Sequence, residues 1–369
     1  MADRVLTLRE LNRATLARQM LVGREQVPVL EAVGRLAGLQ AQVPNPPYVG
    51  LWTRLPDFRR EDLTRLMEER RIVRAAMMRS TLHLVTAGDH QLFRPTVQPA
   101  LVRALAAFFG KRAKGLDTGK LVTAARPFLE EVPRTTGELR GLLSEVEPEA
   151  DPEAMAYAVR TYLPLVQVPP AGTWGSGSRA SYTTADLWLG ENGRTEDPED
   201  LRPLLFRYLA AFGPATVMDF QAWSGMTRLK KAVERIVPEL RVFEDEGGKE
   251  LLDLPGKPLP PASAPVPPRF VPEYDNLLLS HAGRTRVISE EYRKRVFLSA
   301  GRVRATFLVD GFVCGTWKVE RGKDSAALVI EPFEAVPKED LGSLIEEGER
   351  LVRFVEAGAG SHEVRVERP

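Results

Sequence analysis

The chain has 369 residues, 51 Lys and Arg against 50 Asp and Glu, 43% hydrophobic residues and a single cysteine. This composition is typical of a globular protein with two or three compact units, and it excludes an internal disulfide and a thiolate metal cluster. Its four histidines are scattered without ligand spacing, so no metal site is predicted. The sequence has no run of about 18 apolar residues and no signal-peptide pattern at its start. A cytoplasmic protein without membrane contact is therefore expected.

The charges are unevenly distributed although they nearly cancel. Segment 70–114 holds nine basic residues and one acidic residue, Asp89, and segment 284–304 holds seven basic residues against two acidic ones. In segment 130–153 the acidic residues outnumber the basic ones. Segregation of this kind favours one positive face on a neutral protein, although solvated helix faces remain an open alternative.

The first part of the chain has the order of elements of a winged helix, with helices followed by a hairpin. Thr7 and Glu10 form a capping-box pattern at the first helix. Segment 40–47 holds three prolines and is expected to leave helical geometry. The elements expected here are helices at 7–22, 28–38 and 60–70 and strands at 72–78 and 81–85.

The same order recurs twice without a fixed sequence period. In the second copy, Gly172, Gly175 and Gly177 predict a loose hairpin tip. In the third copy, a turn at 213–220 has Thr216 as N-cap and residues 245–248 form a tight hairpin turn. One further helix is expected to begin at 135–139, and others to span 152–163, 201–212 and 229–237. The last of these is in the position of a recognition helix. The further expected strands are 165–168, 240–244 and 250–254.

Segment 255–272 contains eight prolines and predicts an extended linker or wrapping strap. Strands at 302–308, 312–319, 326–330 and 363–366 and a helix at 340–355 follow it. The predicted fold class is α+β, mostly α, with tandem winged-helix (helix-turn-helix) domains and a C-terminal antiparallel β unit. The predicted division is winged-helix units at 1–117, 118–197 and 198–254, the linker at 255–272 and the α+β unit at 273–369.

Gln40 and Gln42 carry the most informative side chains. If 40–42 is extended, both amides project to the same side, where they offer two carbonyl acceptors and four N–H donors. Such a pair can orient one water molecule, but an amide cannot remove its proton near pH 7. The pair therefore suits a reaction with a very good leaving group. The alternative is that both amides only satisfy backbone groups at a helix end.

Four separated motifs resemble the AlkZ/YcaQ-type winged-helix DNA glycosylases, and the resemblance runs from about residue 8 to 331. The Gln-x-Gln sequence resembles the AlkZ branch, because the YcaQ branch has aspartate where this chain has Gln42. Ser80 stands where many relatives have glycine. The motifs are Gly38-Leu-Gln-Ala-Gln42 with the following Pro-Tyr-x-Gly-Leu-Trp, then 78–85 (Met-Arg-Ser-Thr-Leu-His-Leu-Val), 274–281 (Tyr-Asp-Asn-Leu-Leu-Leu-Ser-His) and 305–311 (Ala-Thr-Phe-Leu-Val-Asp-Gly).

The resemblance implies three tandem winged helices around a basic concave surface and a monofunctional glycosylase that hydrolyses the N-glycosidic bond of N7-alkylated guanine, including interstrand crosslinks. Gln40 and Gln42 carry over as the catalytic motif. Our hypothesis is that Gln42 holds the water and that Gln40 supports the water or the sugar. N7 alkylation leaves the purine cationic, so no acid is needed to protonate the departing base. The expected partner is double-stranded DNA with alkylated purines, bound by a monomer without a cofactor.

We expect a shallow, open site, because a bulky crosslinked adduct does not fit a closed pocket.

Other residues are weaker candidates. His83 alternates with apolar neighbours along its strand, so a structural role is the alternative to DNA contact for this residue. Three polar residues after the proline-rich segment could orient that segment or line the site: Asp275, Asn276 and His281. The candidates for DNA contact are Arg74, Arg79, His83, Lys111, Arg112, Arg284 and Arg286.

Two other functions fit the same elements. A winged-helix transcription regulator without catalysis would place helix 229–237 in a major groove, but that segment has no Asn or Gln to read adenine. A protein-interaction scaffold would bind DNA without salt dependence or not at all.

Overall fold

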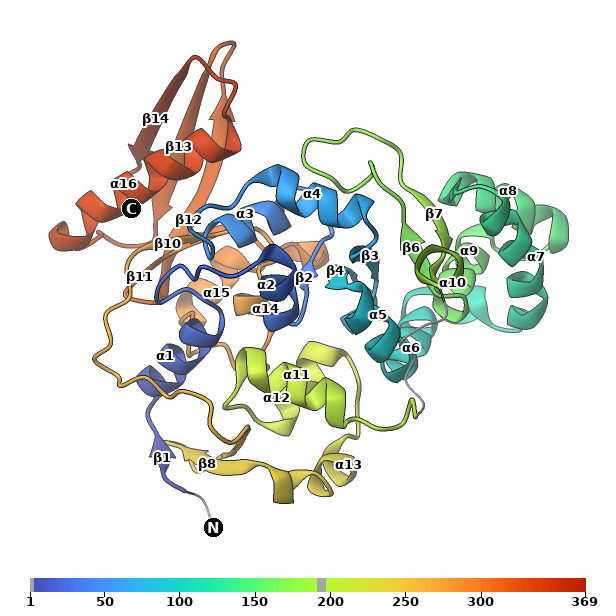
Figure 1. Cartoon of the computed structure of the whole chain (residues 1–369), viewed down its shortest axis with the longest axis horizontal. Coiled ribbons are helices and arrows are strands. Elements are labelled where there is room, and N and C mark those ends of the chain that lie inside the picture. The colour runs from blue at the N-terminus through green and yellow to red at the C-terminus, as the bar shows by residue number, and fades with distance from the viewer. Residues whose placement is uncertain (1–2, 191–196) are drawn as a thin grey trace.

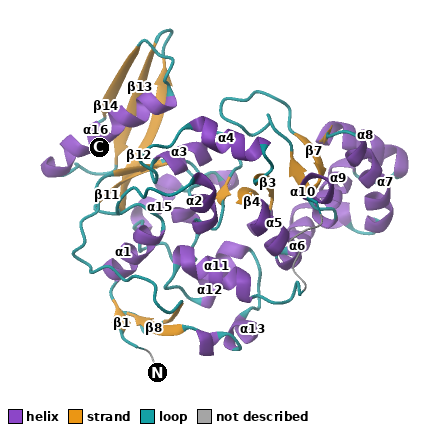
Figure 2. Ribbon diagram, viewed as in Figure 1, coloured by secondary structure: helices purple, strands orange, loops and turns teal. Residues whose placement is uncertain are grey.

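Three β-sheets, with helices packed around them, organise the computed structural model, which describes residues 3–190 and 197–369 (Figures 1 and 2). The helices are α1 (Leu8–Arg18), α2 (Val29–Arg35), α3 (Pro46–Trp52), α4 (Arg60–Glu68), α5 (Ala87–Thr96), α6 (Gln98–Phe109), α7 (Thr118–Glu131), α8 (Thr136–Val146), α9 (Pro152–Tyr162), α10 (Ala185–Leu189), α11 (Arg202–Phe212), α12 (Val217–Ser224), α13 (Lys230–Glu234), α14 (Asn276–Leu279), α15 (Glu290–Val296) and α16 (Lys338–Val355).

The strands are short in the N-terminal half and longer near the C-terminus. They are β1 (Val5–Leu6), β2 (Leu39–Gln40), β3 (Ile72–Ala76), β4 (Leu82–Thr86), β5 (Arg134–Thr135), β6 (Leu165–Gln167), β7 (Ser181–Thr184), β8 (Arg241–Asp245), β9 (Glu250–Asp253), β10 (Arg269–Val271), β11 (Thr306–Val309), β12 (Phe312–Arg321), β13 (Ser325–Pro332) and β14 (Ser361–Val366).

Local sequence signals set several helix starts. The predicted capping box at Thr7 and Glu10 is confirmed, because the Thr7 side chain accepts from the Glu10 backbone N–H and the Glu10 carboxylate accepts from the Thr7 N–H. Thr216 is the N-cap of α12 as predicted, and Asp219 completes its capping box. The hairpin turn at 245–248 also forms, between β8 and β9.

The sheet that carries the Gln-x-Gln segment has six strands in the order β2-β4-β3-β6-β7-β5. Gln40 in β2 pairs with His83 in β4, and Ala75 in β3 pairs with Val166 in β6. Strands from 1–117 and from 118–197 therefore share one hydrogen-bonded sheet. The division of the chain into winged-helix units stays a prediction.

Strand β1 and the proline-rich segment both make contacts with parts of the chain that are distant in sequence. Strand β1 pairs parallel with β8 in the sheet β1-β8-β9. The proline-rich segment lies along α1, where Arg9 and Arg13 donate to the Ala262 and Ala264 carbonyls at 2.8 Å each. Its last residues form β10, so the predicted linker 255–272 ends in a strand.

The C-terminal sheet has the order β10-β11-β12-β13-β14 and lies beside α16 (Figure 1). Its first four strands are antiparallel, but β14 pairs parallel with β13, from Ser361 opposite Ser325 to Val366 opposite Ile330. The prediction of an antiparallel unit is therefore wrong at this edge. The physical reason is that α16 carries the chain back along the sheet before β14 begins, as in a parallel crossover.

Three local expectations also differ from the structure. The segment with three prolines becomes helical at Pro46, because proline is tolerated in the first turn of a helix. The predicted turn 213–220 includes the start of α12. The expected recognition helix 229–237 is shortened to α13, and a 3₁₀ turn with Pro238 follows it.

Aromatic clusters support the sheet that carries the motif. Tyr208, Phe212, Phe220 and Trp223, from α11 and α12, are fully buried and pack with their ring centroids 5.2–6.2 Å apart. This cluster belongs to the core that also packs under β3. Within the described residues, no helix has the length and hydropathy to cross a lipid bilayer.

Candidate functional site

Gln40 and Gln42 both contact the hairpin formed by β3 and β4. The Gln40 Oε1 accepts a hydrogen bond of 2.7 Å from Nη2 of Arg79, which lies in the connection between the two strands. The Gln42 Oε1 accepts one of 2.9 Å from the backbone N–H of Leu82, the first residue of β4. Between them, the Ala41 N–H donates to the Leu82 carbonyl at 2.7 Å. One short connection therefore holds both amides.

These contacts fix which way each amide faces. A guanidinium and a backbone N–H only donate, so the oxygen of each glutamine must face the hairpin and its NH₂ group must face away. Within residues 3–190 and 197–369, neither Nε2 has a hydrogen-bond partner. The side chain of Gln42 is exposed and Gln40 is 8% exposed. The site thus offers N–H donors in a fixed orientation, while each oxygen retains a second lone pair.

Arg79 is held in an unusual conformation. Its φ is +54°, and its Nη1 donates to the Trp223 carbonyl at 2.5 Å while Nη2 holds Gln40. Gly225 lies against it, and a Cβ at that glycine would come within 2.8 Å of the Arg79 Cα. Burial, and secondarily the charge of Arg284, lowers the pKa of Arg79 to about 10, so the guanidinium stays protonated at neutral pH.

Arg74 fixes the backbone of the motif instead of contacting phosphate. Its side chain is buried, its Nε and Nη2 donate to the Ala41 carbonyl at 2.9 and 2.5 Å, and its Nη1 donates to the Gln167 side chain. Gly172 has a positive φ and packs so closely that a Cβ there would lie 2.8 Å from the Arg74 side chain. The DNA contact predicted for Arg74 is therefore corrected to a positioning role.

The residues after the proline-rich segment support the motif from the other side. The Asn276 Nδ2 donates to the Gly38 carbonyl at 2.5 Å, two residues before Gln40. Asp275 forms a bidentate ion pair with Arg54, at 2.8 and 2.9 Å, and both side chains are buried. The two roles predicted for these residues, orienting the segment and lining the site, both stay open. Asp275 and Asn276 also line a crevice beside Gln40.

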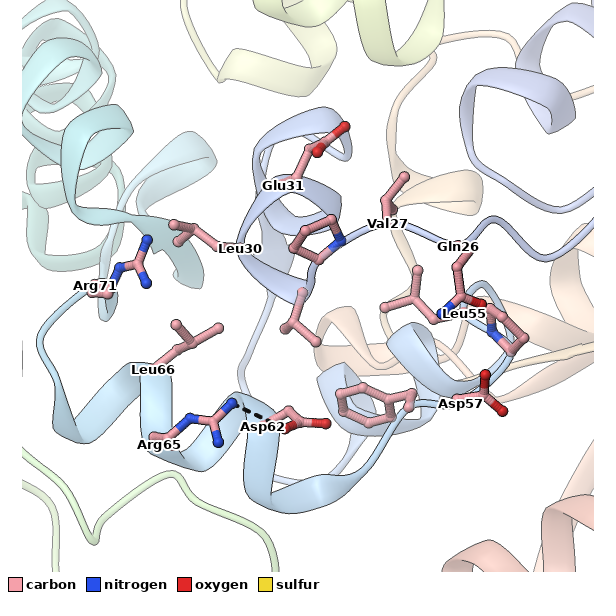
Figure 3. A pocket seen from close by; sticks show the side chains of 14 residues that line it. Gln26, Val27, Leu30, Glu31, Leu55, Asp57, Asp62, Arg65, Leu66 and Arg71 are labelled. Carbon is pink, nitrogen blue, oxygen red and sulfur yellow. Dashed lines mark hydrogen bonds and ion pairs between the residues drawn. The ribbon is translucent and has the colours of Figure 1, made fainter.

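The crevice beside Gln40 is shallow and small. Its volume is about 10 Å³, and Pro46, Pro47, Gly50 and Tyr274 are among its lining residues. This is close to the volume that one water molecule needs and far less than a purine requires. A different groove of about 610 Å³ lies between α2 and α4, and Leu30, Leu55, Arg65, Leu66 and Arg71 are among its lining residues (Figure 3). Neither Gln40 nor Gln42 lines it.

His83 and His281 are buried and neutral. Burial, and then the charge of Arg79, lowers the pKa of His83 to about 3, and its Nδ1 lies 3.0 Å from the Thr81 carbonyl. Burial likewise lowers the pKa of His281 to about 3, and its Nε2 lies 3.1 Å from the Phe212 carbonyl. The DNA contact predicted for His83 is therefore corrected to the structural alternative. His281 packs beside Tyr208 and Phe212, away from the glutamines.

The remaining predicted DNA contacts divide into exposed and buried groups. Lys111 and Arg112 are exposed, although Arg112 pairs with Asp151 at 2.8 Å. Arg284 is half-buried and donates to the Leu278 carbonyl through Nε. Arg286 is buried and donates to the Pro214 carbonyl at 2.9 Å, so its predicted phosphate contact is corrected to a structural one. The described residues contain no group of three or more His, Cys, Asp or Glu placed to hold a metal.

Two contacts near the motif were not predicted from the sequence. Asn45 accepts at 3.0 Å from the Gly175 N–H and thereby links the motif to the loop between β6 and β7. The Tyr157 hydroxyl lies 2.8 Å from the Ser80 hydroxyl, next to Arg79. No local pattern marks either partner, because each pair is far apart in sequence.

The chain is similar to known DNA repair proteins. An interstrand DNA cross-link repair glycosylase of Streptomyces sahachiroi is 25% identical over 348 residues, which is 86% of this chain and 88% of that protein. The solved structure of the Streptomyces sahachiroi DNA glycosylase AlkZ superposes with a TM-score of 0.82 at 22% identity, over 98% of this chain and all of that one. The family model described as "DNA glycosylase AlkZ-like" matches residues 33–354. The chain therefore belongs to the AlkZ-like DNA glycosylase family.

Proposed function

We propose that this protein hydrolyses the N-glycosidic bond of N7-alkylated guanine in duplex DNA, with Gln40 and Gln42 placing the attacking water. The observation that carries the proposal is the fixed orientation of the two amides, whose oxygens are held by Arg79 and Leu82 and whose N–H groups are free. Family membership supports the reaction class.

The chemistry explains why neutral amides suffice. Alkylation at N7 makes the guanine cationic, so it departs as a neutral base and its bond to C1′ is already weakened. The remaining task is to hold water near C1′ while the sugar acquires oxocarbenium character. Orientation of this kind can supply several kcal/mol of the roughly 7–11 kcal/mol attainable from proximity.

We assign the two amides different tasks. Gln42 is exposed to solvent, so we propose that it contacts the water. Gln40 lies deeper, beside the small crevice, and supports the water or the sugar. A shallow site also suits a bulky adduct or an interstrand crosslink, the lesion named for the Streptomyces relative.

The proposal is tested with a duplex that carries one 7-methylguanine. Incubation with the protein is expected to release the free base and leave an abasic site in an otherwise intact strand, because water is the nucleophile. A matched duplex with guanine should remain unchanged. Binding to both duplexes without base release would instead favour the non-catalytic regulator.

The excision rate is expected to be nearly independent of pH between about 6 and 8.5, because no group assigned to the site titrates there. Amides do not ionise, His83 has a pKa of about 3 and is neutral above it, and Arg79 has a pKa of about 10 and is charged below it. Single-turnover rates across this range check the prediction. A rate that follows one ionisation with a midpoint near pH 7 would require a general acid or base.

Replacement of Arg79 by methionine is expected to lower the single-turnover rate by roughly 10- to 100-fold, since it removes a charge-assisted hydrogen bond that orients Gln40. Affinity for DNA should change little, and Arg79→Lys should retain part of the rate. Arg103→Met is the matched control, because Arg103 donates to Thr227 and not to a glutamine.

A double-mutant cycle separates positioning from DNA contact. If Arg79 acts through Gln40, Arg79→Met should have little further effect in a Gln40→Ala background. A lower DNA affinity with an unchanged rate at saturating protein would favour the DNA contact predicted for Arg79 from the sequence over a positioning role.

A further inference from the structure

Phe108 is the most exposed large hydrophobic side chain of the described residues, at 65%. It lies on the apolar stripe of α6, one and two turns beyond the buried Leu105 and Leu101. The last turn of α6 extends past the edge of the core, so this ring projects where the pattern of the helix calls for burial. A single exposed ring is common on protein surfaces, so its neighbours decide whether it belongs to an interaction surface.

The surroundings of Phe108 combine aromatic and basic groups. Its ring meets the Tyr157 ring edge to face, with centroids 5.8 Å apart and an interplanar angle of 73°. The Arg160 guanidinium lies 5.1 Å from the Tyr157 ring. Lys111 is exposed one turn beyond Phe108. We call Phe108 and Tyr157 the aromatic edge.

The aromatic edge is connected to Gln40 through the adjacent residues Arg79 and Ser80. The Tyr157 hydroxyl lies 2.8 Å from the Ser80 hydroxyl, and the neighbouring Arg79 holds Gln40 at 2.7 Å. Both features therefore share the connection between β3 and β4. In the fold, α6 lies beside α5 and close to this hairpin (Figure 1).

We propose that Phe108 is a wedge that inserts into the base stack of duplex DNA beside the lesion, which deepens the proposed function and rests on it. Flanking cations attract the phosphates, and an exposed ring gains apolar contact only when bases cover it. The crevice beside Gln40 is too small to enclose a purine. An unstacked base step exposes C1′ to Gln42 without a pocket for the base.

The wedge is tested first by a readout that needs no turnover. A duplex carries 2-aminopurine next to a tetrahydrofuran abasic analogue, and unstacking raises its fluorescence. The wild-type protein and Phe108→Trp are expected to raise the signal, and Phe108→Ala is expected to leave it near that of free duplex. Leu187→Ala, which removes a 54% exposed side chain on α10, is the matched control and should behave like the wild type.

Excision provides the second readout. Phe108→Ala should slow release of 7-methylguanine from duplex DNA about tenfold, the scale of one lost stacking contact, and should leave release from single-stranded DNA unchanged. If the wild-type protein raised the fluorescence but released no base, the wedge would stand and the proposed glycosylase activity would be wrong. The wedge would be overturned if Phe108→Ala matched the wild type in fluorescence and in excision rate on duplex DNA. It would also be overturned if the only effect of Phe108→Ala were a change in self-association, measured by sedimentation.

Discussion

Replacement of Gln42 by alanine is expected to lower the excision of 7-methylguanine by about 100-fold or more, the scale of removing one preorganised hydrogen-bond donor from a reacting centre. The side chain is exposed and, among the described residues, makes one hydrogen bond, accepted at 2.9 Å from the Leu82 N–H, which water can replace. Stability and DNA affinity should therefore stay close to wild type. Single-turnover kinetics with protein in excess measures the rate separately from binding.

Gln40→Ala and Gln91→Ala complete this comparison. Gln40→Ala removes the acceptor of Arg79 and should also slow the reaction. Among the described residues, the Gln91 side chain donates to the Gly190 carbonyl and forms no hydrogen bond with the hairpin, so Gln91→Ala should excise at the wild-type rate. Full activity of Gln42→Ala would remove that residue from the mechanism.

Asp275→Ala is expected to reduce the free energy of unfolding by about 3–5 kcal/mol, because it leaves the Arg54 charge buried without its counterion. The pair is bidentate, and the side chains are 0% and 1% exposed. The Gly50 and Gln19 carbonyls would remain as acceptors for Arg54, but they carry no full charge. Urea unfolding followed by circular dichroism measures the loss.

The control for this prediction is an exposed ion pair. Asp62 lies 3.1 Å from Arg65 on α4, with both side chains partly in water, and Asp62→Ala should cost no more than about 1 kcal/mol. Equal effects of the two substitutions would mean that the Arg54–Asp275 pair contributes no more than a surface contact.

Local signals predicted several helix starts and one hairpin turn because their chemistry is short-range. Thr7 with Glu10 and Thr216 with Asp219 satisfy the free N–H groups of their own helices, and the Asp245–Gly248 turn closes a hairpin between neighbours in sequence. The parallel pairing of β14 with β13 depends on how α16 packs, which no window of sequence contains.

The roles of the basic residues could not be predicted from charge alone. Arg74 and Arg286 lie in segments that carry an excess of positive charge, yet both are buried and bonded to backbone carbonyls. An arginine can be buried wherever several carbonyls converge on its five donors, and that convergence is a tertiary property. The sequence indicated the two glutamines as candidate site residues, but only the fold brings together the groups that orient them.

The central claim is that two oriented amides suffice because the departing base is already cationic. Its most direct test compares 7-methylguanine with hypoxanthine, a neutral purine, at the same position of the same duplex, using single-turnover release of the free base. The account predicts release of 7-methylguanine and no detectable release of hypoxanthine. Comparable release of both bases would contradict it, because a neutral leaving group needs an acid that the amides do not supply.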